Sequence, residues 1–364
     1  MKQTVLEKNL IEKLKIAIQD VTPGVVVRAY QTGRLICDIQ VGQTHPYYDL
    51  ASLTKVFFTQ QTMMQAFDKG LWSMDGEKSK VKDFLPDFFN SEITIQSLIT
   101  HSSGLDWWKP FYKDLVPQVS HAQDWNLDWQ LQRTKMYSLL NKPDSYKPTG
   151  KSVYSDLGFI LLGFILEKMY QKNLYEIWCE TKASYYPDST VDFNLNNKPL
   201  FDVASYAPTE ECAVRKQVLR GIVHDENTWA LGGISTHAGL FGSIDDLSAM
   251  ALNTRSQLMG IAKYKIRQKT AQLFAMRSVP TEVGDWAMGY MMPSVENPSC
   301  GPHFSIHSIG HTGFTGTSFW YDPRNDLLVL ALSNRVNYGR DNRRFVSLRP
   351  QIHTWIFESL KRVI

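Results

Sequence analysis

The sequence has few cysteines and little net charge. Its four cysteines, Cys37, Cys179, Cys212 and Cys300, are scattered through 364 residues without a C-x-x-C pair. We therefore expect reduced thiols rather than a disulfide framework or a cysteine metal site. The 39 Lys and Arg residues nearly balance the 36 Asp and Glu residues, which leaves a net charge of +3. Because nucleic-acid binders usually carry a strong basic excess, we expect no nucleic acid as a partner.

Long apolar runs are also absent. The longest, residues 157–166, reaches only about half the length that a bilayer requires. Residues 1–20 mix acids and bases with apolar residues, and they lack the apolar core and cleavage site of a secretory signal. As written, the sequence predicts no membrane span and a cytoplasmic protein, or a periplasmic one if a leader has been removed. It leaves the oligomeric state open.

Aromatic side chains are abundant, at 12% of the residues. Two clusters stand out, residues 107–112 and 125–130. Aromatic rings bury large areas and often line pockets. The tryptophans of residues 107–129 therefore either cover a pocket as a lid or pack within a helical block.

The first third of the chain shows a change of hydrophobic period. Residues 4–20 have apolar residues at helical spacing. Two alternating runs, 24–31 and 35–42, are joined by Thr32-Gly33 and predict a β-hairpin. Helical spacing returns at residue 51, and a glycine at residue 70 predicts the end of that helix.

The rest of the chain divides into a helical part and a part rich in strands. Residues 71–237 have the composition of helix and loop. A capping box, Ser243 with Asp246, predicts the start of the next helix. The remaining elements that we predict are a helix over 244–258, strands over 285–292, 303–310, 314–321 and 326–333, and a closing helix over 350–362.

This order predicts an α/β (α+β) fold in which both ends of the chain share one antiparallel sheet flanked by helices. The mainly helical part is then an inserted subdomain. We expect residues 1–364 to form a single domain, with an α/β subdomain (1–50 and 238–364) and a helical subdomain (51–237). Ligand sites often lie in clefts between such units.

Several sequence motifs of other enzyme classes are excluded. Gly150-Lys151-Ser152 lacks the leading glycine and the preceding strand of a phosphate loop, and neither G-x-S-x-G nor H-E-x-x-H occurs. His303, His307 and His311 have a four-residue spacing, but on the predicted strand their rings would spread along some 26 Å. We expect no metal and no cofactor.

An S-x-x-K motif occurs twice, as Ser52–Lys55 and as Ser79–Lys82. The second lies in a polar stretch typical of a solvated surface. The first opens an apolar-faced helix, where Ser and Lys at i and i+3 share one face about 5–6 Å apart. A helix N-terminus also favours developing negative charge. Ser52 therefore meets the requirements of an activated nucleophile.

Two further motifs follow in order, Tyr154-Ser155-Asp156 and His311-Thr312-Gly313. The first resembles the Tyr-x-Asn element, and the second the Lys-Thr-Gly element, of serine β-lactamases and penicillin-recognising peptidases. In those enzymes both elements follow an S-x-x-K motif, as they follow Ser52–Lys55 here. The sequence is most similar to the class C β-lactamase-related group, which includes DD-peptidases, D-aminopeptidases and esterases. The resemblance extends over nearly the whole chain from about residue 22.

The resemblance implies a role for each motif residue. Ser52 would be the nucleophile and Lys55 the general base, which requires that burial lower the pKa of Lys55 towards neutrality. Tyr154 would carry the proton to the leaving group. The backbone N–H groups of Ser52 and Phe314 would form the oxyanion hole. His311 would assist proton transfer or attract a substrate carboxylate.

The resemblance also implies substrate contacts at Thr312 and Gly313 and at Asp156. The sequence departs from the family pattern at two positions, His311 and Asp156. His311 stands where β-lactamases carry Lys, and histidine is only partly charged near pH 7, so carboxylate binding would depend on pH. Asp156 stands where Asn is usual. It is an expected substrate contact that accepts hydrogen bonds but does not donate them when ionised, and it has the alternative of pairing with Lys55.

Five other polar residues have structural or functional interpretations. We expect His101 to anchor its loop through hydrogen bonds. His224, Asp225 and Glu226 form a polar cluster, for which we favour a buried network that braces the cleft over direct chemistry. His237 is a further residue that can reach the cleft.

The sequence thus predicts a serine hydrolase that acts through an acyl-enzyme on Ser52. Its expected partner is a small-molecule ester, amide or β-lactam, with esters and amides of D-amino-acid type favoured. A true β-lactamase or DD-carboxypeptidase is the alternative within the same chemistry. A penicillin-binding sensor module that acylates without turnover is the alternative of another class.

Overall fold

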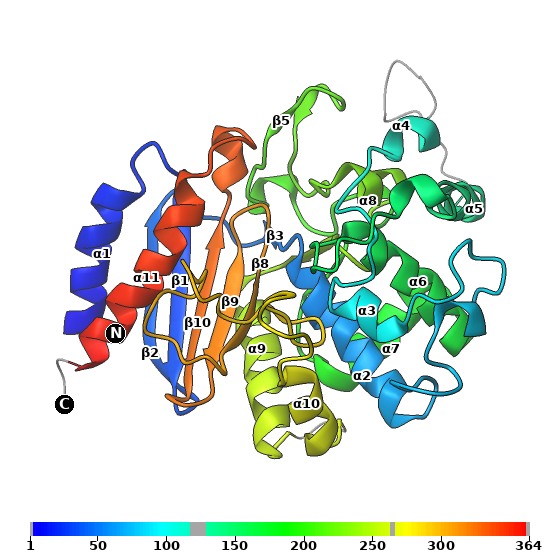
Figure 1. The fold of residues 1–364 in the computed structure, drawn as a ribbon. Helices are drawn as coiled ribbons and strands as arrows, with labels where there is room; N and C mark the ends of the chain where they lie inside the picture. The colour runs from blue at the N-terminus through cyan, green and yellow to red at the C-terminus, as the bar shows by residue number, and fades with distance from the viewer. Residues whose placement is uncertain (1–2, 117–128, 263–265, 362–364) are drawn as a thin grey trace.

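A computed structural model describes residues 3–116, 129–262 and 266–361. A five-stranded antiparallel sheet lies at its centre, with strand order β2-β1-β10-β9-β8 (Figure 1). The sheet joins both ends of the chain, because β1 pairs with β2 on one side and with β10 on the other. The prediction of one antiparallel sheet shared by the two ends is therefore confirmed. The strands are β1 (Gly24–Gln31), β2 (Arg34–Gly42), β8 (Ile309–Thr312), β9 (Ser318–Asp322) and β10 (Leu327–Ser333).

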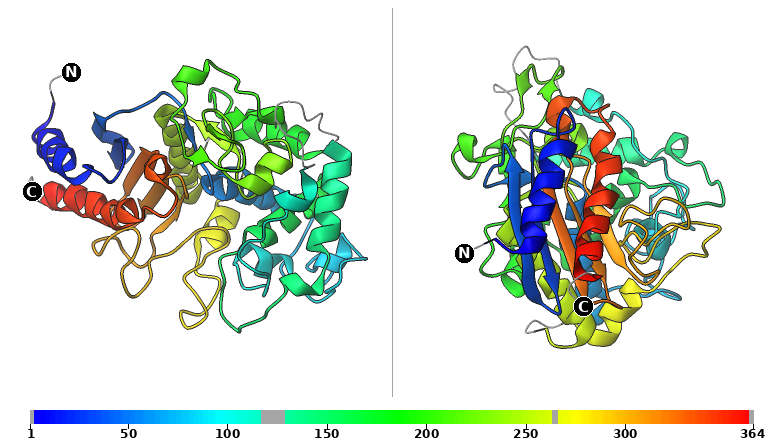
Figure 2. Two further views of the ribbon diagram at one scale, coloured as in Figure 1. Left: turned by 90° about the horizontal axis from the view of Figure 1, so that it is seen from above. Right: turned by 90° about the vertical axis from the view of Figure 1, so that its left-hand side faces the viewer.

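Two helices from opposite ends of the chain cover one face of the sheet. They are α1 (Val5–Ala17) and α11 (Arg344–Lys361), and they lie side by side (Figures 1 and 2). Residues one apart on a strand point to opposite faces. Accordingly, Val25 and Val27 pack in the cluster under these helices, whereas Val26 packs in the larger cluster on the other side.

The other face carries α9 and the helical part of the molecule (Figure 1). Three short strands form a small sheet of order β3-β7-β4, and β5 pairs with β6 in a hairpin. The helices are η1 (Lys55–Gln60), which is π-helical, α2 (Gln61–Asp68), α3 (Ile95–Ile99), α4 (Tyr112–Leu115), α5 (Trp129–Leu140), α6 (Asp156–Tyr170), α7 (Leu174–Tyr185), α8 (Glu226–Ala230), α9 (Ile244–Met259) and α10 (Gln268–Ala275). The short strands are β3 (Tyr48–Asp49), β4 (Asp192–Phe193), β5 (Glu211–Cys212), β6 (Gln217–Val218) and β7 (Leu240–Gly242).

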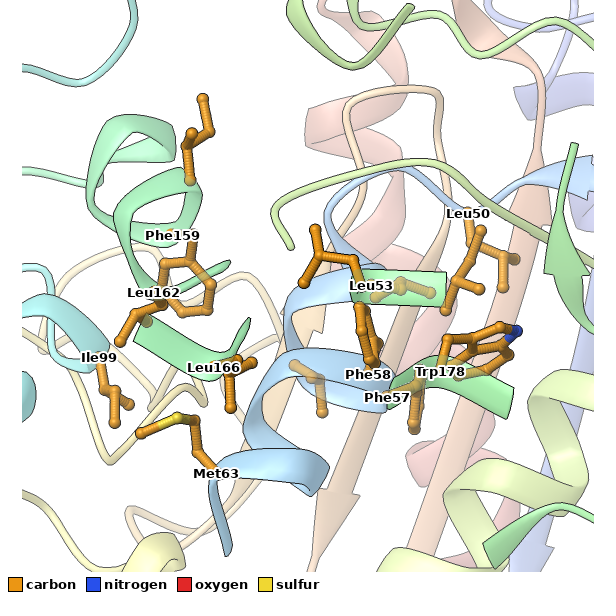
Figure 3. Packing of buried hydrophobic residues seen from close by; sticks show 14 of the residues in the cluster. Leu50, Leu53, Phe57, Phe58, Met63, Ile99, Phe159, Leu162, Leu166 and Trp178 are labelled. Atoms are coloured by element: carbon orange, nitrogen blue, oxygen red, sulfur yellow. The ribbon is translucent and has the colours of Figure 1, made fainter. Parts of the chain in front are cut away.

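The core holds η1 and α6 against each other. Phe57 and Phe58 of η1 are fully buried, as are Phe159 and Leu162 of α6 (Figure 3). The ring of Phe58 packs edge-on against Trp178 with centroids 5.4 Å apart. Because η1 follows Ser52 and α6 begins at Asp156, this packing fixes the relative position of two motifs that lie about a hundred residues apart.

Several local predictions are confirmed. The hairpin turn consists of Thr32 and Gly33, both with positive φ (50° and 74°), as a type I′ turn requires. Ser243 and Asp246 form the predicted capping box at the start of α9. The helical segment after residue 51 ends two residues before Gly70, whose φ of 67° suits the C-terminal cap.

Other predicted boundaries are wrong. Residues 285–292 form bends with two isolated antiparallel bridges, Trp286–Met291 and Met291–Gly310, rather than a strand. The strands predicted over 303–310 and 314–321 are reduced to β8 and β9. The apolar run at 285–292 reflects side chains that are buried from irregular backbone, such as Trp286 and Met288. The closing helix begins at Arg344, before the predicted start at residue 350, and continues through Pro350.

Within the described residues, none of the helices is both long enough and apolar enough to cross a bilayer.

Candidate active site

Ser52 lies in a turn between β3 and η1 whose backbone is held by a buried carboxylate. Ala51, the residue before it, has a left-handed φ of 48°, which is strained for a residue with a Cβ. The Asp49 carboxylate accepts the Ala51 N–H at 2.8 Å and the His224 N–H at 2.7 Å. Burial raises the pKa of Asp49, although these hydrogen bonds oppose the shift. Asp49 thus fixes the turn that presents the serine.

Lys55 is fully buried one helical turn after Ser52. Its Nζ donates to Ser52 Oγ at 3.1 Å, to Asp156 Oδ1 at 2.6 Å and to the His237 carbonyl oxygen at 3.0 Å. The three bonds use all three protons of an ammonium group. The structure therefore brings Asp156 to Lys55, which was the alternative that the sequence offered for this residue.

The expectation that burial lowers the pKa of Lys55 towards neutrality is wrong in its net direction. Burial does oppose the charged form, but the adjacent Asp156 carboxylate outweighs it and raises the pKa of Lys55. At neutral pH the resting site therefore contains a lysine ammonium paired with a carboxylate.

Tyr154 lies on the other side of the serine. Its hydroxyl donates to Ser52 Oγ at 2.7 Å, and its ring centroid lies 4.9 Å from Lys55 Nζ. Burial raises the pKa of Tyr154, against the opposing effect of Lys55. Ser52 Oγ is thus within hydrogen-bond distance of two groups that can exchange protons.

The turn between β8 and β9 packs against the backbone that precedes Ser52. Thr315 Oγ1 donates to the Asp49 carbonyl oxygen at 2.8 Å, and Thr317 Oγ1 donates to the Leu50 carbonyl oxygen at 3.0 Å. Among the described residues, the backbone N–H groups of Ser52 and Phe314 have no protein acceptor. Two free donors therefore lie on segments that these threonines hold together.

His311 lies in β8 and is neutral rather than partly charged as expected. It is buried, and burial lowers its pKa to about 3, with Lys55 contributing in the same direction. Its Nδ1 lies 2.9 Å from the Thr312 carbonyl oxygen, so Nδ1 carries the proton and Nε2 is unprotonated. His311 thus supplies no positive charge for a substrate carboxylate. Thr312 Oγ1 is 3.8 Å from Met291 Sδ.

Asp225 and Glu226 are hydrogen-bonded to residues outside the His224-Asp225-Glu226 cluster, and the bracing role expected for the cluster stays a prediction. Asp225 Oδ1 lies 2.8 Å from His237 Nε2, and the Glu226 carboxylate accepts from Arg340 at 2.6 Å. Burial opposes ionisation of Asp225, but the nearby imidazole lowers its pKa overall.

Three of these side chains offer donor atoms of the kind that bind metals. Asp156, Asp225 and His237 place one ligand atom each within 4.8 Å of one another. However, the Lys55 ammonium already occupies Asp156 Oδ1, and a cation there would face that positive charge. The arrangement suits proton sharing better than metal binding.

A pocket of about 290 Å³ opens over Ser52. Trp107, Trp108 and Phe314 line its apolar side, so the first aromatic cluster contributes to the pocket. Residues 125–128 of the second cluster lie outside the described residues. His237 reaches the pocket, whose polar lining is Asp49, Ser52, Tyr154, Asp156, His224, Asp225, Glu226, His237 and Arg340.

Sequence reasoning missed two residues that shape the site. Asp49 was recognisable only as a charged residue in an otherwise apolar run before Ser52. Trp286, whose ring stacks on that of Tyr154 at 5.8 Å, carried no signal beyond its size. The second S-x-x-K motif does not form a comparable site, because the Ser79 hydroxyl donates its hydrogen bond to the Gly76 carbonyl oxygen.

The fold and the arrangement of its motifs define a class of protein, and comparison with known sequences agrees. A sequence model described as Beta-lactamase matches residues 7–349. The chain belongs to the β-lactamase family, whose members include class C β-lactamases and penicillin-binding peptidases, and it is a hydrolase of that family.

Named relatives show the range of the family. The chain is 28% identical over 359 residues to an N-acetylmuramyl-L-alanine amidase of Bacillus subtilis (strain 168), covering 86% of this chain and 77% of the relative. It is 25% identical to a protein of Escherichia coli (strain K12) named "Putative D-alanyl-D-alanine carboxypeptidase", covering 80% and 70%. Among solved structures, the hydrolase EstCE1, described as having promiscuous acyltransferase activity, matches with a TM-score of 0.70 and 19% identity over 95% of this chain and 98% of the other. The last likeness shows the fold alone.

Proposed function

We propose that the protein is a serine hydrolase in which Ser52 attacks a carbonyl and forms an acyl-enzyme. The observation that carries this proposal is the environment of Ser52 Oγ, which is bonded to both Lys55 Nζ and Tyr154 OH at the floor of a pocket. A serine hydroxyl is a weak nucleophile unless an adjacent group takes its proton. Two such groups in contact with one serine oxygen provide a route for that proton.

Asp156 gives this route a particular form. Because Lys55 is fully buried, the ion pair Lys55–Asp156 can convert to a neutral pair by moving one proton from Nζ to the carboxylate. The resulting amine takes the Ser52 proton as the carbonyl is attacked. Tyr154 then gives its proton to the leaving group and recovers one from Lys55. Every proton is returned when water releases the acyl group by the reverse path.

The backbone N–H groups of Ser52 and Phe314 would stabilise the oxyanion. Both lack protein acceptors among the described residues, and donors already in place need no reorganisation during the reaction. Each such donor typically contributes about 2.7–4 kcal/mol to barrier lowering.

The proposed substrates are small esters, or amides of D-amino-acid type. The neutral state of His311 favours them over β-lactams and peptides that require a charge opposite their carboxylate. The amidase and carboxypeptidase names of the relatives support amide substrates as well. Trp107 and Trp108 would contact the apolar part of the substrate.

The proposal is tested by intact-mass measurement during turnover. The protein is mixed with a chromogenic ester, a chromogenic cephalosporin, a D-Ala-D-Ala peptide and an N-acetylmuramyl-L-alanine amide in separate reactions. We expect ester or amide turnover and a transient adduct of the acyl mass. A permanent cephalosporoyl adduct without turnover would instead identify a sensor, and fast cephalosporin turnover a β-lactamase.

Ser52→Ala should abolish both adduct and turnover. Ser79→Ala is the matched control, because it alters the other S-x-x-K motif, and it should keep full activity. Full activity of Ser52→Ala would overturn the proposal.

A further inference from the structure

His101 has a strained and fully enclosed position next to the site. It follows α3, is 1% exposed, and has a left-handed φ of 57°. That conformation is strained for a residue with a Cβ. A buried polar residue that keeps such a backbone needs compensating contacts.

The compensating contacts lie on both sides of Tyr154 in the sequence. The His101 carbonyl oxygen accepts the Val153 N–H at 2.8 Å, and its Nδ1 accepts the Ser155 N–H at 2.9 Å. His101 therefore binds the residue before Tyr154 and the residue after it. The left-handed backbone turns the carbonyl and the side chain of one residue towards the same segment.

The imidazole ring also contacts Tyr154 directly. The two ring centroids are 4.7 Å apart, and the Trp286 ring packs against both, at 4.3 Å from His101 and 5.8 Å from Tyr154. Because Nδ1 accepts a hydrogen bond, the ring is neutral with its proton on Nε2. No bond joins His101 to Ser52 or Lys55 within the described chain.

We propose that His101 is a positioning residue that holds the Tyr154 hydroxyl against Ser52 through the 153–155 backbone and the ring contact. The inference rests on the proposed function, in which Tyr154 moves a proton. An error of about 1 Å in such a group can cost of order a hundredfold in rate. His101 thereby affects the chemical step without touching the substrate.

Substitutions at His101 separate its acceptor from its backbone conformation. His101→Gly adopts the left-handed backbone without strain but loses Nδ1 and the ring, and His101→Gln puts its acceptor one atom too far out. His101→Asn keeps an acceptor near the Nδ1 position and tolerates positive φ. The exposed His307 gives a matched control as His307→Asn.

The experiment measures kcat, KM and thermal stability with the ester that the wild type hydrolyses. We expect kcat to fall at least tenfold in His101→Gly and His101→Gln with KM within twofold, and His101→Asn to recover most of the loss. In a Tyr154→Phe background, His101→Gly should cause no further loss.

Equal losses from His101→Gly in the wild-type and Tyr154→Phe backgrounds would overturn the inference, as would an unchanged kcat. If His101→Gly does not fold, the kcat values of His101→Gln and His101→Asn are compared instead. A lower kcat in His101→Gln supports the inference, and equal kcat values overturn it. Failure of the proposed function is distinguishable, because Ser52→Ala or Tyr154→Phe would then retain full activity.

Discussion

At the scale of single residues, the Lys55–Asp156 pair sets the pH range of the site. Asp156→Asn removes the carboxylate that raises the pKa of Lys55, while burial, which lowers it, remains. In the proposed mechanism this carboxylate also takes the proton that Lys55 must lose, so in the variant the ammonium has to release that proton to solvent instead. We expect the acid limb of kcat/KM to move to higher pH, measured from pH 5 to 9.

The exposed Asp188 provides the control as Asp188→Asn, which should leave the profile unchanged. An acid limb that stays in place or moves to lower pH in Asp156→Asn would show that the pair does not supply the base.

The identity of the main site residues was predictable from the sequence, but their charge states were not. Motif spacing pointed to Ser52, Lys55 and Tyr154, and the structure places all three in mutual contact. The sequence offered the pairing of Lys55 with Asp156 only as an alternative, and it left the charge states open. The pKa of Lys55 depends on whether the Asp156 carboxylate outweighs burial, and that of His311 depends on burial, which only the folded structure shows.

At the scale of elements, the β8–β9 turn depends on the absence of a side chain at Gly313. A Cβ there would lie 2.0 Å from Thr317 Oγ1 and 2.8 Å from the Leu50 carbonyl oxygen. Gly313→Ala should push the turn away from the Ser52 segment and displace the Phe314 N–H. We expect kcat to fall about 10²- to 10³-fold, as for loss of one oxyanion donor.

Gly70→Ala is the matched control, because a Cβ at Gly70 meets nothing within 4 Å. Its positive φ costs some stability, but kcat should be unchanged. A Gly313→Ala enzyme with wild-type kcat would show that the turn does not form part of the oxyanion hole.

Elements defined by local chemistry were the ones that the sequence predicted well. The hairpin turn at Thr32-Gly33 and the Ser243 capping box depend on a few adjacent residues. The strand predicted over 285–292 failed because its backbone bonds lie elsewhere: the Met288 N–H donates to the Phe274 carbonyl oxygen, and the Gly289 N–H donates to that of Ile99. A run of buried, mostly apolar residues resembled a strand without being one.

At the scale of the whole molecule, the sheet is closed by pairing β1 with β10, about three hundred residues apart. Helix α11 seals one face of this sheet and buries His353 completely. Neither ring nitrogen of His353 makes a well-formed hydrogen bond among the described residues, and the contact with the Cys300 backbone, which favours protonation, has a smaller effect than burial. The packing of the two chain ends thus depends on keeping this imidazole neutral.

This burial makes the fold sensitive to mild acid. Burial lowers the pKa of His353 from 6.5 to about 3, and Arg349 adds to the shift; His311 has the same value. The unfolded chain binds protons at these histidines below pH 6.5, whereas the folded chain does so only near pH 3. The contribution of these histidines to the free energy of unfolding is therefore fully present above pH 6.5 and is lost progressively down to pH 3. At pH 5 the loss is up to about 2 kcal/mol per histidine.

His353→Phe removes one of these titrations and can retain the ring contact with Phe304, whose centroid lies 5.6 Å from that of His353. Thermal unfolding at pH 7.5 and pH 5 should show a smaller loss of stability in the variant than in the wild type. Glu210, with a pKa lowered to about 2 from 4.5, loses its contribution only at lower pH and does not interfere. An equal acid loss in both proteins would mean that His353 is already protonated, or exposed, in the folded state.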